Sequence, residues 1–330
     1  MAEISNMLNK NRMNLGEKAP LATPLVIQLE TSGYCNLECS FCPCGDKEAR
    51  KLFPQDIMSL ETFRLFIDQC KEFPDKIKVL RFIGIGEPLV NTNIALFVKM
   101  AKESGLFERV EITTNGLLIT DELAIELVNA GLDTILISLE STNEDLFYKI
   151  ANRKVDLSAF KEQLKRFYSI RKNTKIYIKT TNMGTESEEE FYSEYGEFCD
   201  YIYVESVIEN WPEFSAGAIN GAVRYKNEEY QKAKKVCIQP FKVLCLSANG
   251  DVMPCSVDWK RVLRLGNINT EKLADIWNGK KRNELLCSLL ELSKEGLLCD
   301  KCKYVTQNQP DDIDDYREEI VKRIRKQING

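Results

Sequence analysis

Runs of β-branched and aromatic residues alternate with amphipathic stretches along the first two thirds of the chain. The runs have the composition of β-strands, and they cover residues 25–30, 79–84, 109–114, 134–139, 175–180 and 201–205. Strands that alternate with helices pair in parallel through right-handed crossover connections. The pattern therefore predicts an α/β fold, either a doubly wound sheet or a barrel.

The stretches between these runs carry the start and stop signals of helices. Ser59 can cap a helix whose apolar residues recur three and four positions apart, at Phe63, Phe66, Ile67 and Cys70. Further helices are expected over residues 93–104, 120–131 and 158–171 and from 187 onward. In either fold, functional residues are expected at the carboxyl ends of the strands.

The alternation of strands and helices stops at about Val236, where cysteines cluster and Asn249–Gly250 predicts a tight turn. We place a domain boundary near residue 230. The chain then has an N-terminal extension (1–21), a strand-and-helix domain (22–230), a small Cys-rich domain (231–306) and a C-terminal helix (307–330). Tyr316, Ile320 and Ile324 lie on one side of that helix, so we expect it to pack on the body.

Composition narrows the classes of function. The 330 residues are 44% hydrophobic and 29% charged, the balance of a folded protein, and 45 basic against 50 acidic residues give a net charge of -5. A mildly acidic chain has no general attraction to phosphate backbones or anionic membranes. No segment approaches the roughly 20 apolar residues of a membrane span, and the N-terminus lacks a signal peptide. We expect a cytoplasmic protein with no nucleic-acid or membrane partner.

The chain has 12 cysteines and no histidine. In a cytoplasmic protein, so many cysteines indicate metal binding or catalysis rather than a disulfide framework. The lack of histidine excludes Ser-His triads, Cys-His nucleophiles, HExxH zinc sites and 2-His-1-carboxylate iron sites. Any metal is therefore expected on thiolates, and acid–base chemistry falls to other side chains.

Three cysteines directly follow the first predicted strand. Residues 33–43 read GYCNLECSFCP, so Cys35, Cys39 and Cys42 have the spacing C-x3-C-x2-C. Three close thiolates can hold three irons of a [4Fe–4S] cluster and leave the fourth iron open; a zinc loop or reduced core cysteines are the alternatives. The segment resembles the signature of the radical S-adenosylmethionine (SAM) superfamily. In that family the open iron chelates SAM, and one electron releases a 5′-deoxyadenosyl radical.

Further segments at the ends of successive predicted strands strengthen this resemblance. Residues 84–88 (GIGEP) resemble the segment that binds the SAM amino group, 113–116 (TTNG) the turn beside the nucleoside, and 137–140 (ISLE) a strand whose serine contacts SAM. An Asp is more usual at the last position of that strand. The resemblance implies a partial (β/α)6 TIM-type barrel. It also implies the SAM-binding residues Phe41, Gly86, Glu87, Pro88, Asn115, Ser138, Glu140 and, as a cation for the SAM carboxylate, Arg153 or Lys149.

A second cysteine set lies downstream. With Gly250, it resembles the auxiliary-cluster domain of the SPASM/twitch group of radical SAM enzymes over residues 236–305. The resemblance implies one auxiliary [4Fe–4S] cluster, held by Cys237, Cys255, Cys299 and Cys302. Four thiolates also suit tetrahedral zinc, which is the alternative. Cys245 is left out of this set because Cys237 and Gly250 already have the family spacing.

The four-cysteine set also resembles the smaller twitch-type enzymes, which include aminocyclitol dehydrogenases. The leading hypothesis is therefore a radical SAM oxidoreductase that abstracts a substrate hydrogen and oxidises a secondary alcohol of a carbohydrate or aminocyclitol-like small molecule. The alternatives are a radical epimerase of a sugar or aminocyclitol, a peptide (RiPP) maturase, and a non-catalytic iron–sulfur or zinc module. The family implies a flavodoxin- or ferredoxin-type electron donor.

Candidates for residues that face the substrate follow the late predicted strands. They are Lys179, Asn182, Glu205, Glu209 and Trp211. Because the chain has no histidine, burial would have to tune a group such as Lys179 or Glu205 to that role. An epimerase needs a hydrogen-atom donor instead, and Cys199 and Cys245 are the candidates.

Overall fold

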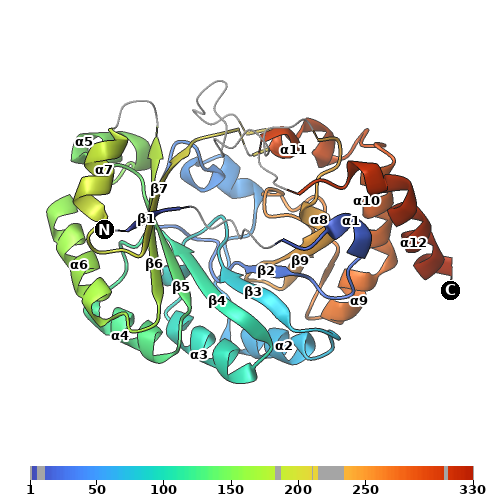
Figure 1. Cartoon of the computed structure of the whole chain (residues 1–330), viewed down its shortest axis with the longest axis horizontal. Helices are drawn as coiled ribbons and strands as arrows, with labels where there is room; N and C mark the ends of the chain where they lie inside the picture. The colour runs from blue at the N-terminus through green and yellow to red at the C-terminus, as the bar shows by residue number, and fades with distance from the viewer. Residues whose placement is uncertain are drawn as a thin grey trace.

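The computed structural model describes residues 2–5, 12–182, 187–209, 211–214, 234–307 and 311–329. Within this part of the chain, ten strands form one sheet in the order β1-β7-β6-β5-β4-β3-β2-β8-β9-β10 (Figure 1). Neighbouring strands from β1 to β8 are parallel, and β8–β9 and β9–β10 are antiparallel. The predicted α/β class is therefore confirmed. The strands are β1 (Glu3–Ile4), β2 (Val26–Leu29), β3 (Ile77–Phe82), β4 (Phe107–Thr114), β5 (Thr134–Leu139), β6 (Lys175–Asn182), β7 (Tyr201–Ser206), β8 (Val243–Leu246), β9 (Asp251–Met253) and β10 (Gly266–Asn267).

Helices cover one face of the parallel strands, as Figure 1 shows. They are α2 (Leu60–Cys70), α3 (Ile94–Ser104), α4 (Asp121–Asn129), α5 (Glu144–Ala151), α6 (Leu157–Ile170) and α7 (Glu188–Tyr195). The side chains of Ser59, Thr120 and Ser187 cap α2, α4 and α7 by accepting from the N–H three residues on. Alternate strand residues such as Ile135 and Ile137 are buried in the core under these helices.

The opposite face of the same strands carries polar and aromatic side chains together with aliphatic ones such as Val79 and Leu136. Arg81 donates to Glu111 across β3 and β4 at 2.6 Å, and Tyr177 stacks on Tyr201 across β6 and β7 with ring centroids 4.4 Å apart. Side chains alternate along a strand, so these residues share the face turned away from the helices. A doubly wound sheet carries helices on both faces. The arrangement is therefore the partial barrel.

The Cys-rich part of the chain (231–306), called the auxiliary part below, continues the same sheet. Its first strand, β8, pairs in parallel with β2, and Cys245 lies opposite Gln28. The strands β9 and β10 then extend the sheet beyond β8. The expected boundary near residue 230 falls outside the described residues. The auxiliary part therefore adds directly to the edge of the barrel sheet.

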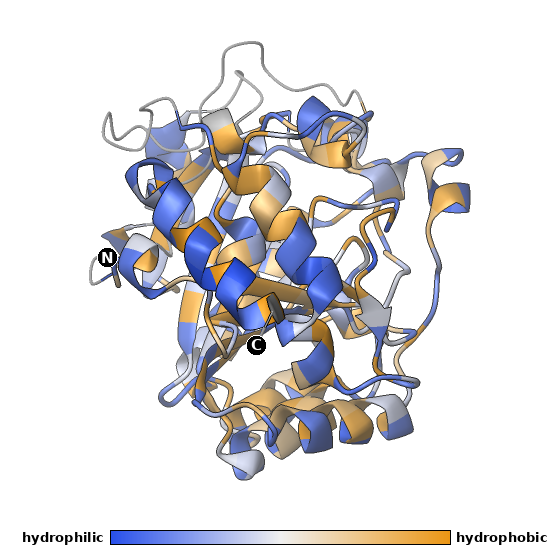
Figure 2. Ribbon diagram, turned by 90° about the vertical axis from the view of Figure 1, so that its right-hand side faces the viewer, coloured by the Kyte–Doolittle hydropathy of each residue, from blue (hydrophilic) through white to orange (hydrophobic). Residues whose placement is uncertain are grey.

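A second hydrophobic core joins the two ends of the chain. It lies between α1 (Leu15–Lys18), α8 (Gln239–Lys242), α10 (Lys280–Leu290) and α12 (Arg317–Asn329), and it buries Leu15, Phe241, Leu286, Ile320 and Ile324. Figure 2 shows α12 at the front, with polar and apolar residues interspersed along it. The expected packing of the C-terminal helix on the body is confirmed. Residues of the N-terminal extension belong to this core as well.

Arg282 of α10 fixes three elements of the auxiliary part. Its buried guanidinium donates to the carbonyl groups of Pro240 at 3.0 Å and Trp277 at 2.9 Å, and it stacks 3.3 Å from the Trp277 ring centroid. Burial lowers the pKa of Arg282 to about 9. Backbone carbonyls and an aromatic face thus replace the water that this cation loses on folding.

Short elements complete the described structure. They are η1 (Pro43–Gly45), η2 (Ala49–Leu52), η3 (Pro88–Val90), α9 (Leu273–Asn278), η5 (Leu298–Lys301), α11 (Tyr304–Gln307) and η6 (Asp314–Tyr316). None of the helices that the structure describes has the length and apolar character needed to cross a membrane.

Replacing Ile320 by Ala should destabilise the protein through the second core. Ile320 is 0% exposed, and removing a buried aliphatic side chain to Ala costs about 2–5 kcal/mol. Chemical denaturation followed by circular dichroism measures the free energy of unfolding. The matched control is Ile328→Ala in the same helix, where Ile328 is 37% exposed and a change within about 0.5 kcal/mol is expected. Equal effects of the two substitutions would contradict the packing described here.

Candidate active site and cluster ligands

The loop after β2 brings the first cysteine set together at the carboxyl end of that strand. Cys35, Cys39 and Cys42 all lie in this loop, where a negative charge on Cys35 would raise the pKa of the other two thiols. Burial is the main reason that both pKa values are raised. The pKa of Cys42 is raised to about 12, and that of Cys39 well above its usual range. The Cys42 N–H donates to the Cys39 carbonyl at 3.0 Å, which closes the loop on itself.

Glu87 of the GIGEP turn connects this loop to the ends of β3 and β4. Its backbone N–H donates to the Tyr34 carbonyl at 2.7 Å. Its buried carboxylate accepts from the Thr114 hydroxyl at 2.6 Å, the Asn115 N–H at 2.8 Å and the Leu89 N–H at 3.0 Å. Burial raises the pKa of Glu87, and these hydrogen bonds lower it. One carboxylate therefore fixes both turns at which the resemblance places SAM.

Gly86 permits the close approach of the GIGEP turn to the cysteine loop. A Cβ at this position would lie 2.2 Å from the Ser32 carbonyl oxygen and 2.6 Å from that of Tyr34. Real Cβ atoms do not come this close to backbone, so any side chain here would push the two segments apart. Pro88 of the same turn is buried, and its carbonyl oxygen accepts a hydrogen bond from the Thr31 hydroxyl at 3.1 Å.

Other residues of the expected SAM site surround the same loop. The Asn115 amide donates to the Asn36 side chain at 2.7 Å, and the Arg153 guanidinium donates to the Asn36 carbonyl at 3.1 Å. Phe41 lies in the loop and accepts from the Trp211 indole through its carbonyl oxygen at 3.1 Å. The structure therefore brings the predicted residues of three strand ends to one place.

Ser138 and Glu140 come from the end of β5. Glu140 is buried, contacts the Cys39 thiol and accepts from the Thr181 hydroxyl at 3.2 Å. Burial raises the pKa of Glu140 to about 7, while the positive charge of Lys179 lowers it. Ser138 lies opposite Lys179 in the β5–β6 register. Glu140 thus links the cysteine loop to β6.

Lys179 and Glu205 form an ion pair beside this group. They lie on the face of β6 and β7 that is turned away from the helices, and their side chains are only 17% and 11% exposed. Glu209 pairs with Lys303 of the auxiliary part. The side chain of Asn182 lies outside the described residues. Of the expected substrate-facing residues, the structure therefore brings Lys179 and Glu205 together next to Glu140.

The two candidate hydrogen donors are placed differently. Cys199 comes before β7, at the amino end of that strand, and its thiol donates to the Tyr195 carbonyl at 3.4 Å in the helical core. This is the end of the barrel opposite the cysteine loop, so Cys199 is removed from the candidates. Cys245 instead lies on β8, buried against Gln28, with Sγ 3.5 Å from the Gln28 side-chain oxygen.

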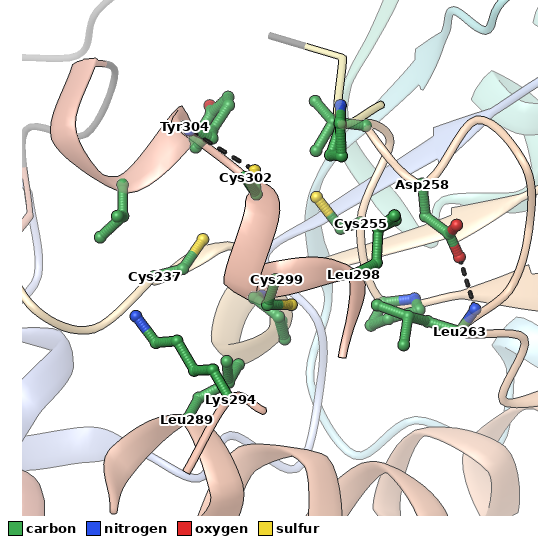
Figure 3. A pocket seen from close by; sticks show the side chains of 15 residues that line it. Cys237, Cys255, Asp258, Leu263, Leu289, Lys294, Leu298, Cys299, Cys302 and Tyr304 are labelled. Atoms are coloured by element: carbon green, nitrogen blue, oxygen red, sulfur yellow. Dashed lines mark hydrogen bonds between the residues drawn. The ribbon is translucent and has the colours of Figure 1, made fainter. Parts of the chain in front are cut away.

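The second cysteine set lines one pocket of the auxiliary part. Figure 3 shows the side chains of Cys237, Cys255, Cys299 and Cys302 around this pocket, with Lys294 beside them. Cys237 precedes α8, Cys255 follows β9, and the other two belong to the turn around η5. Burial raises the pKa of Cys237 to about 12 and that of Cys299 to about 11, while the charge of Lys294 lowers both.

Both thiol sets fit iron–sulfur clusters by their donor chemistry. Among the described residues, no three His, Cys, Asp or Glu side chains are arranged to hold a single metal ion. A four-iron cluster gives each thiolate its own iron, so its ligands stand further apart than those of one ion. Next to Cys35, the Asn36 side-chain nitrogen is buried with no acceptor, and a cluster sulfide is an acceptor of the kind it lacks. Bound iron would also deprotonate thiols whose pKa burial has raised.

Comparison with known protein families decides which chemistry these sites belong to. The sequence matches the Radical SAM superfamily over residues 29–195 and the SPASM iron–sulfur cluster-binding domain over residues 237–303. The chain belongs to the radical SAM superfamily. The predicted family is therefore confirmed, and with it the cofactors that its two domains imply, SAM and [4Fe–4S] clusters.

Several curated radical SAM proteins resemble the chain. A GTP 3′,8-cyclase of Desulforamulus reducens is 36% identical over 38% of this chain, which spans only 37% of that protein. A tungsten-containing aldehyde ferredoxin oxidoreductase cofactor-modifying protein of Pyrococcus furiosus is 23% identical and covers 77% of this chain and 81% of its own length. An S-adenosyl-L-methionine-dependent 2-deoxy-scyllo-inosamine dehydrogenase of Niallia circulans is 22% identical, with coverage of 88% and 96%.

Solved radical SAM structures share the fold. BtrN in complex with AdoMet and 2-DOIA superposes with a TM-score of 0.57 at 19% identity, covering 88% of this chain and 97% of BtrN. Native anSMEcpe with bound AdoMet gives a TM-score of 0.56 at 15% identity, covering 92% and 96%. The two agreements are similar, so the fold alone does not choose a substrate.

One contact of the site carries no signal in the sequence. Arg261 of the auxiliary part donates to Glu30, directly after β2, at 2.5 Å. Glu30 could have been noticed as a charged residue at the end of a strand, where function gathers in this fold. Arg261 belongs to no motif and lies 231 positions further along the chain.

Replacing Glu87 by Gln should loosen the SAM site. An amide has only one accepting oxygen, so at least one of the Thr114 and Asn115 donors loses its partner, at a cost of about 1–3 kcal/mol. We expect a lower free energy of unfolding and weaker SAM binding, measured by denaturation and by equilibrium dialysis. Glu126→Gln on the exposed side of α4 is the control. Unchanged SAM binding in the Glu87 variant would contradict the role given to this carboxylate.

Replacing Cys255 by Ser should remove one cluster and leave the other. After anaerobic reconstitution, we expect about four irons per chain instead of about eight. Iron, sulfide and zinc analysis of the same samples makes the measurement, and zinc in the unsubstituted protein would support the zinc alternative. Cys245→Ser is the matched control because Cys245 is also buried but lies outside the ligand set. Loss of iron in that control would mean that Cys245 is a ligand.

Proposed function

We propose that this radical SAM enzyme oxidises a secondary alcohol of an aminocyclitol or a similar carbohydrate-like molecule. The observation that carries the proposal is the buried Lys179–Glu205 pair, which lies beside Glu140 at the carboxyl ends of β5 to β7. A charged, hydrogen-bonding surface at this place suits a substrate rich in hydroxyl and amino groups. It suits an apolar substrate poorly, since buried polar groups left without partners are costly.

The relatives support the same substrate class. The 2-deoxy-scyllo-inosamine dehydrogenase matches this chain over 96% of its own length, and BtrN, solved with 2-DOIA, shares the fold. The four-cysteine auxiliary pocket agrees with an oxidation because an alcohol becomes a ketone by losing two electrons, and the second needs an acceptor. A flavodoxin- or ferredoxin-type protein is the proposed source of the electron that starts the reaction.

The residues of the chain divide the remaining work. When bound, SAM and the two clusters supply the radical that takes a hydrogen atom from the carbinol carbon and the acceptor for the electron that leaves afterwards. Cys35, Cys39 and Cys42 would hold the SAM cluster, and the other four cysteines the auxiliary cluster. The Glu205 carboxylate takes the proton of the substrate hydroxyl as the C=O bond forms. The Lys179 ammonium holds that carboxylate in place and stabilises its charge.

The first experiment asks whether the alcohol is oxidised. Reconstituted enzyme with SAM and dithionite is offered aminocyclitols and amino sugars deuterated at the carbinol carbon. We expect one deuterium in 5′-deoxyadenosine for each ketone formed. Deoxyadenosine without ketone or deuterium from any of these substrates would count against the proposal.

Glu205→Gln should lower kcat by roughly a hundredfold, the usual contribution of a general base. Iron content and the affinity for SAM should not change, because the cysteine loop contacts Glu140 through the Cys39 thiol and not Glu205. The matched control is Glu194→Gln, which removes the carboxylate of the Lys161–Glu194 pair on the helical side of the sheet. An unchanged kcat in the Glu205 variant would exclude it as the base.

A radical epimerase is the second candidate, and the position of Cys245 favours it. This thiol lies on β8 inside the sheet, close enough for the Glu30 charge to raise its pKa. An epimerase would need such a thiol to return a hydrogen atom to the substrate. Cys245→Ser distinguishes the two, because a dehydrogenase keeps its turnover in this variant and an epimerase loses it.

A further inference from the structure

A loop of the auxiliary part reaches from the second cysteine set to the first. It begins at Cys255, one of the proposed auxiliary ligands. The Asp258 carboxylate holds the loop by accepting from the N–H groups of Val262 at 3.0 Å and Leu263 at 2.8 Å. Asp258 also lines the pocket of the four cysteines. One side chain therefore shapes the loop and forms part of the wall of the auxiliary site.

Arg261 lies at the tip of this loop in an uncommon backbone conformation. Its φ is 58°, in the left-handed region that residues other than glycine rarely adopt. Its guanidinium donates to the Glu30 carboxylate at 2.5 Å, and the two side chains are only 6% and 8% exposed. Loss of one partner of a buried ion pair strongly destabilises a protein, because the other charge is left buried and unpaired. The pair therefore holds both residues in fixed positions.

Glu30 also contacts the GIGEP turn, so it links this turn to Arg261. Its second carboxylate oxygen accepts from the Ile85 N–H at 3.0 Å. Gly84 packs directly on its side chain, where a Cβ would lie 2.4 Å from the Glu30 Cγ. Because Gly86 and Glu87 follow at once, Glu30 helps to set the turn that faces the cysteine loop.

Aromatic residues make a second link between the same two sites. Trp259 of the loop packs edge-on against Phe53, with ring centroids 6.4 Å apart, and donates to the Pro212 carbonyl at 2.8 Å. The neighbouring Trp211 donates to the carbonyl of Phe41 in the cysteine loop at 3.1 Å. The auxiliary loop therefore contacts the SAM side through both charge and packing.

We propose that Arg261 is a positioning residue of the SAM site, which couples the affinity for SAM to the assembly of the auxiliary site. Loss of a Cys255-bound cluster frees the start of the loop, so Arg261 no longer holds Glu30 against the GIGEP turn. Coupling between two binding events is reciprocal. Bound SAM therefore also favours an assembled auxiliary site.

The test measures SAM binding to reconstituted holoenzyme by equilibrium dialysis, without reductant or substrate. We expect Arg261→Gln to weaken SAM binding roughly tenfold, within the usual range of such couplings, while the iron content stays unchanged. Arg264→Gln is the matched control, because Arg264 is 57% exposed and pairs with Asp251 within the auxiliary part. Unsubstituted affinity in the Arg261 variant overturns the proposal.

A double-variant comparison identifies the route of the coupling. We expect Cys255→Ser to weaken SAM binding by a similar factor, and the Arg261→Gln/Cys255→Ser double variant to bind no more weakly than either single variant. Such non-additivity means that both substitutions act through one loop. If the two factors multiply, or if Cys255→Ser loses iron without any change in SAM affinity, the proposal fails.

A third variant keeps the test decisive if the single substitution at Arg261 prevents folding. Glu30→Gln/Arg261→Met removes both buried charges together, a replacement that is often neutral for stability. It keeps an acceptor for Ile85 but not the link to the loop. We expect the weakened SAM affinity again, and unsubstituted affinity in the folded double variant would refute the coupling. No substrate enters these measurements, so their outcome is independent of the proposed oxidation.

Discussion

Glu87 holds the carboxyl ends of three parallel strands together through its buried carboxylate and its backbone N–H. It accepts from Thr114 and Asn115 at the end of β4, and its own N–H donates to Tyr34 in the loop after β2. Each of these donors would cost about 1–3 kcal/mol if it were buried without a partner. Glu87 therefore supplies hydrogen bonds that keep the two turns and the cysteine loop together. Groups of the protein itself thus fix the arrangement of these segments, which is the condition for electrostatic pre-organisation.

The continuity of the sheet explains how the auxiliary part takes part in this site. Because β8 pairs with β2, the loops that leave β8 and β9 begin next to the strand that leads into the cysteine loop. Arg261 can then meet Glu30 across 231 positions of sequence. The second core also stabilises the auxiliary part, because Arg282 and the packing of α10 on α12 hold its helices. Two cysteine sets that are distant in sequence thus share one scaffold.

The sequence predicted the parts of the site that depend on local spacing and strand order. The cysteine loop, the GIGEP turn and Asn115 lie together in the structure because parallel strands bring their carboxyl ends to one edge. Contacts between distant segments, such as Arg261 with Glu30, have no local pattern to reveal them. The positions of Cys199 and Cys245 relative to the site also depend on strand pairing. Which end of a strand a residue occupies depends on where pairing begins, and Cys199 falls just before β7.

Lys179 and Glu205 already pair with each other, and this pairing constrains any substrate. A molecule that enters must offer these groups hydrogen bonds at least as good as those they make with each other, because both are largely removed from water. A hydroxyl or ammonium group can do so, and a hydrocarbon cannot. Sites built to hydrogen-bond a substrate reject analogues without the matching group far more strongly than apolar pockets reject a missing methylene. Selectivity for a polyhydroxylated or aminated ring would therefore arise from the cost of leaving these two charges unpaired.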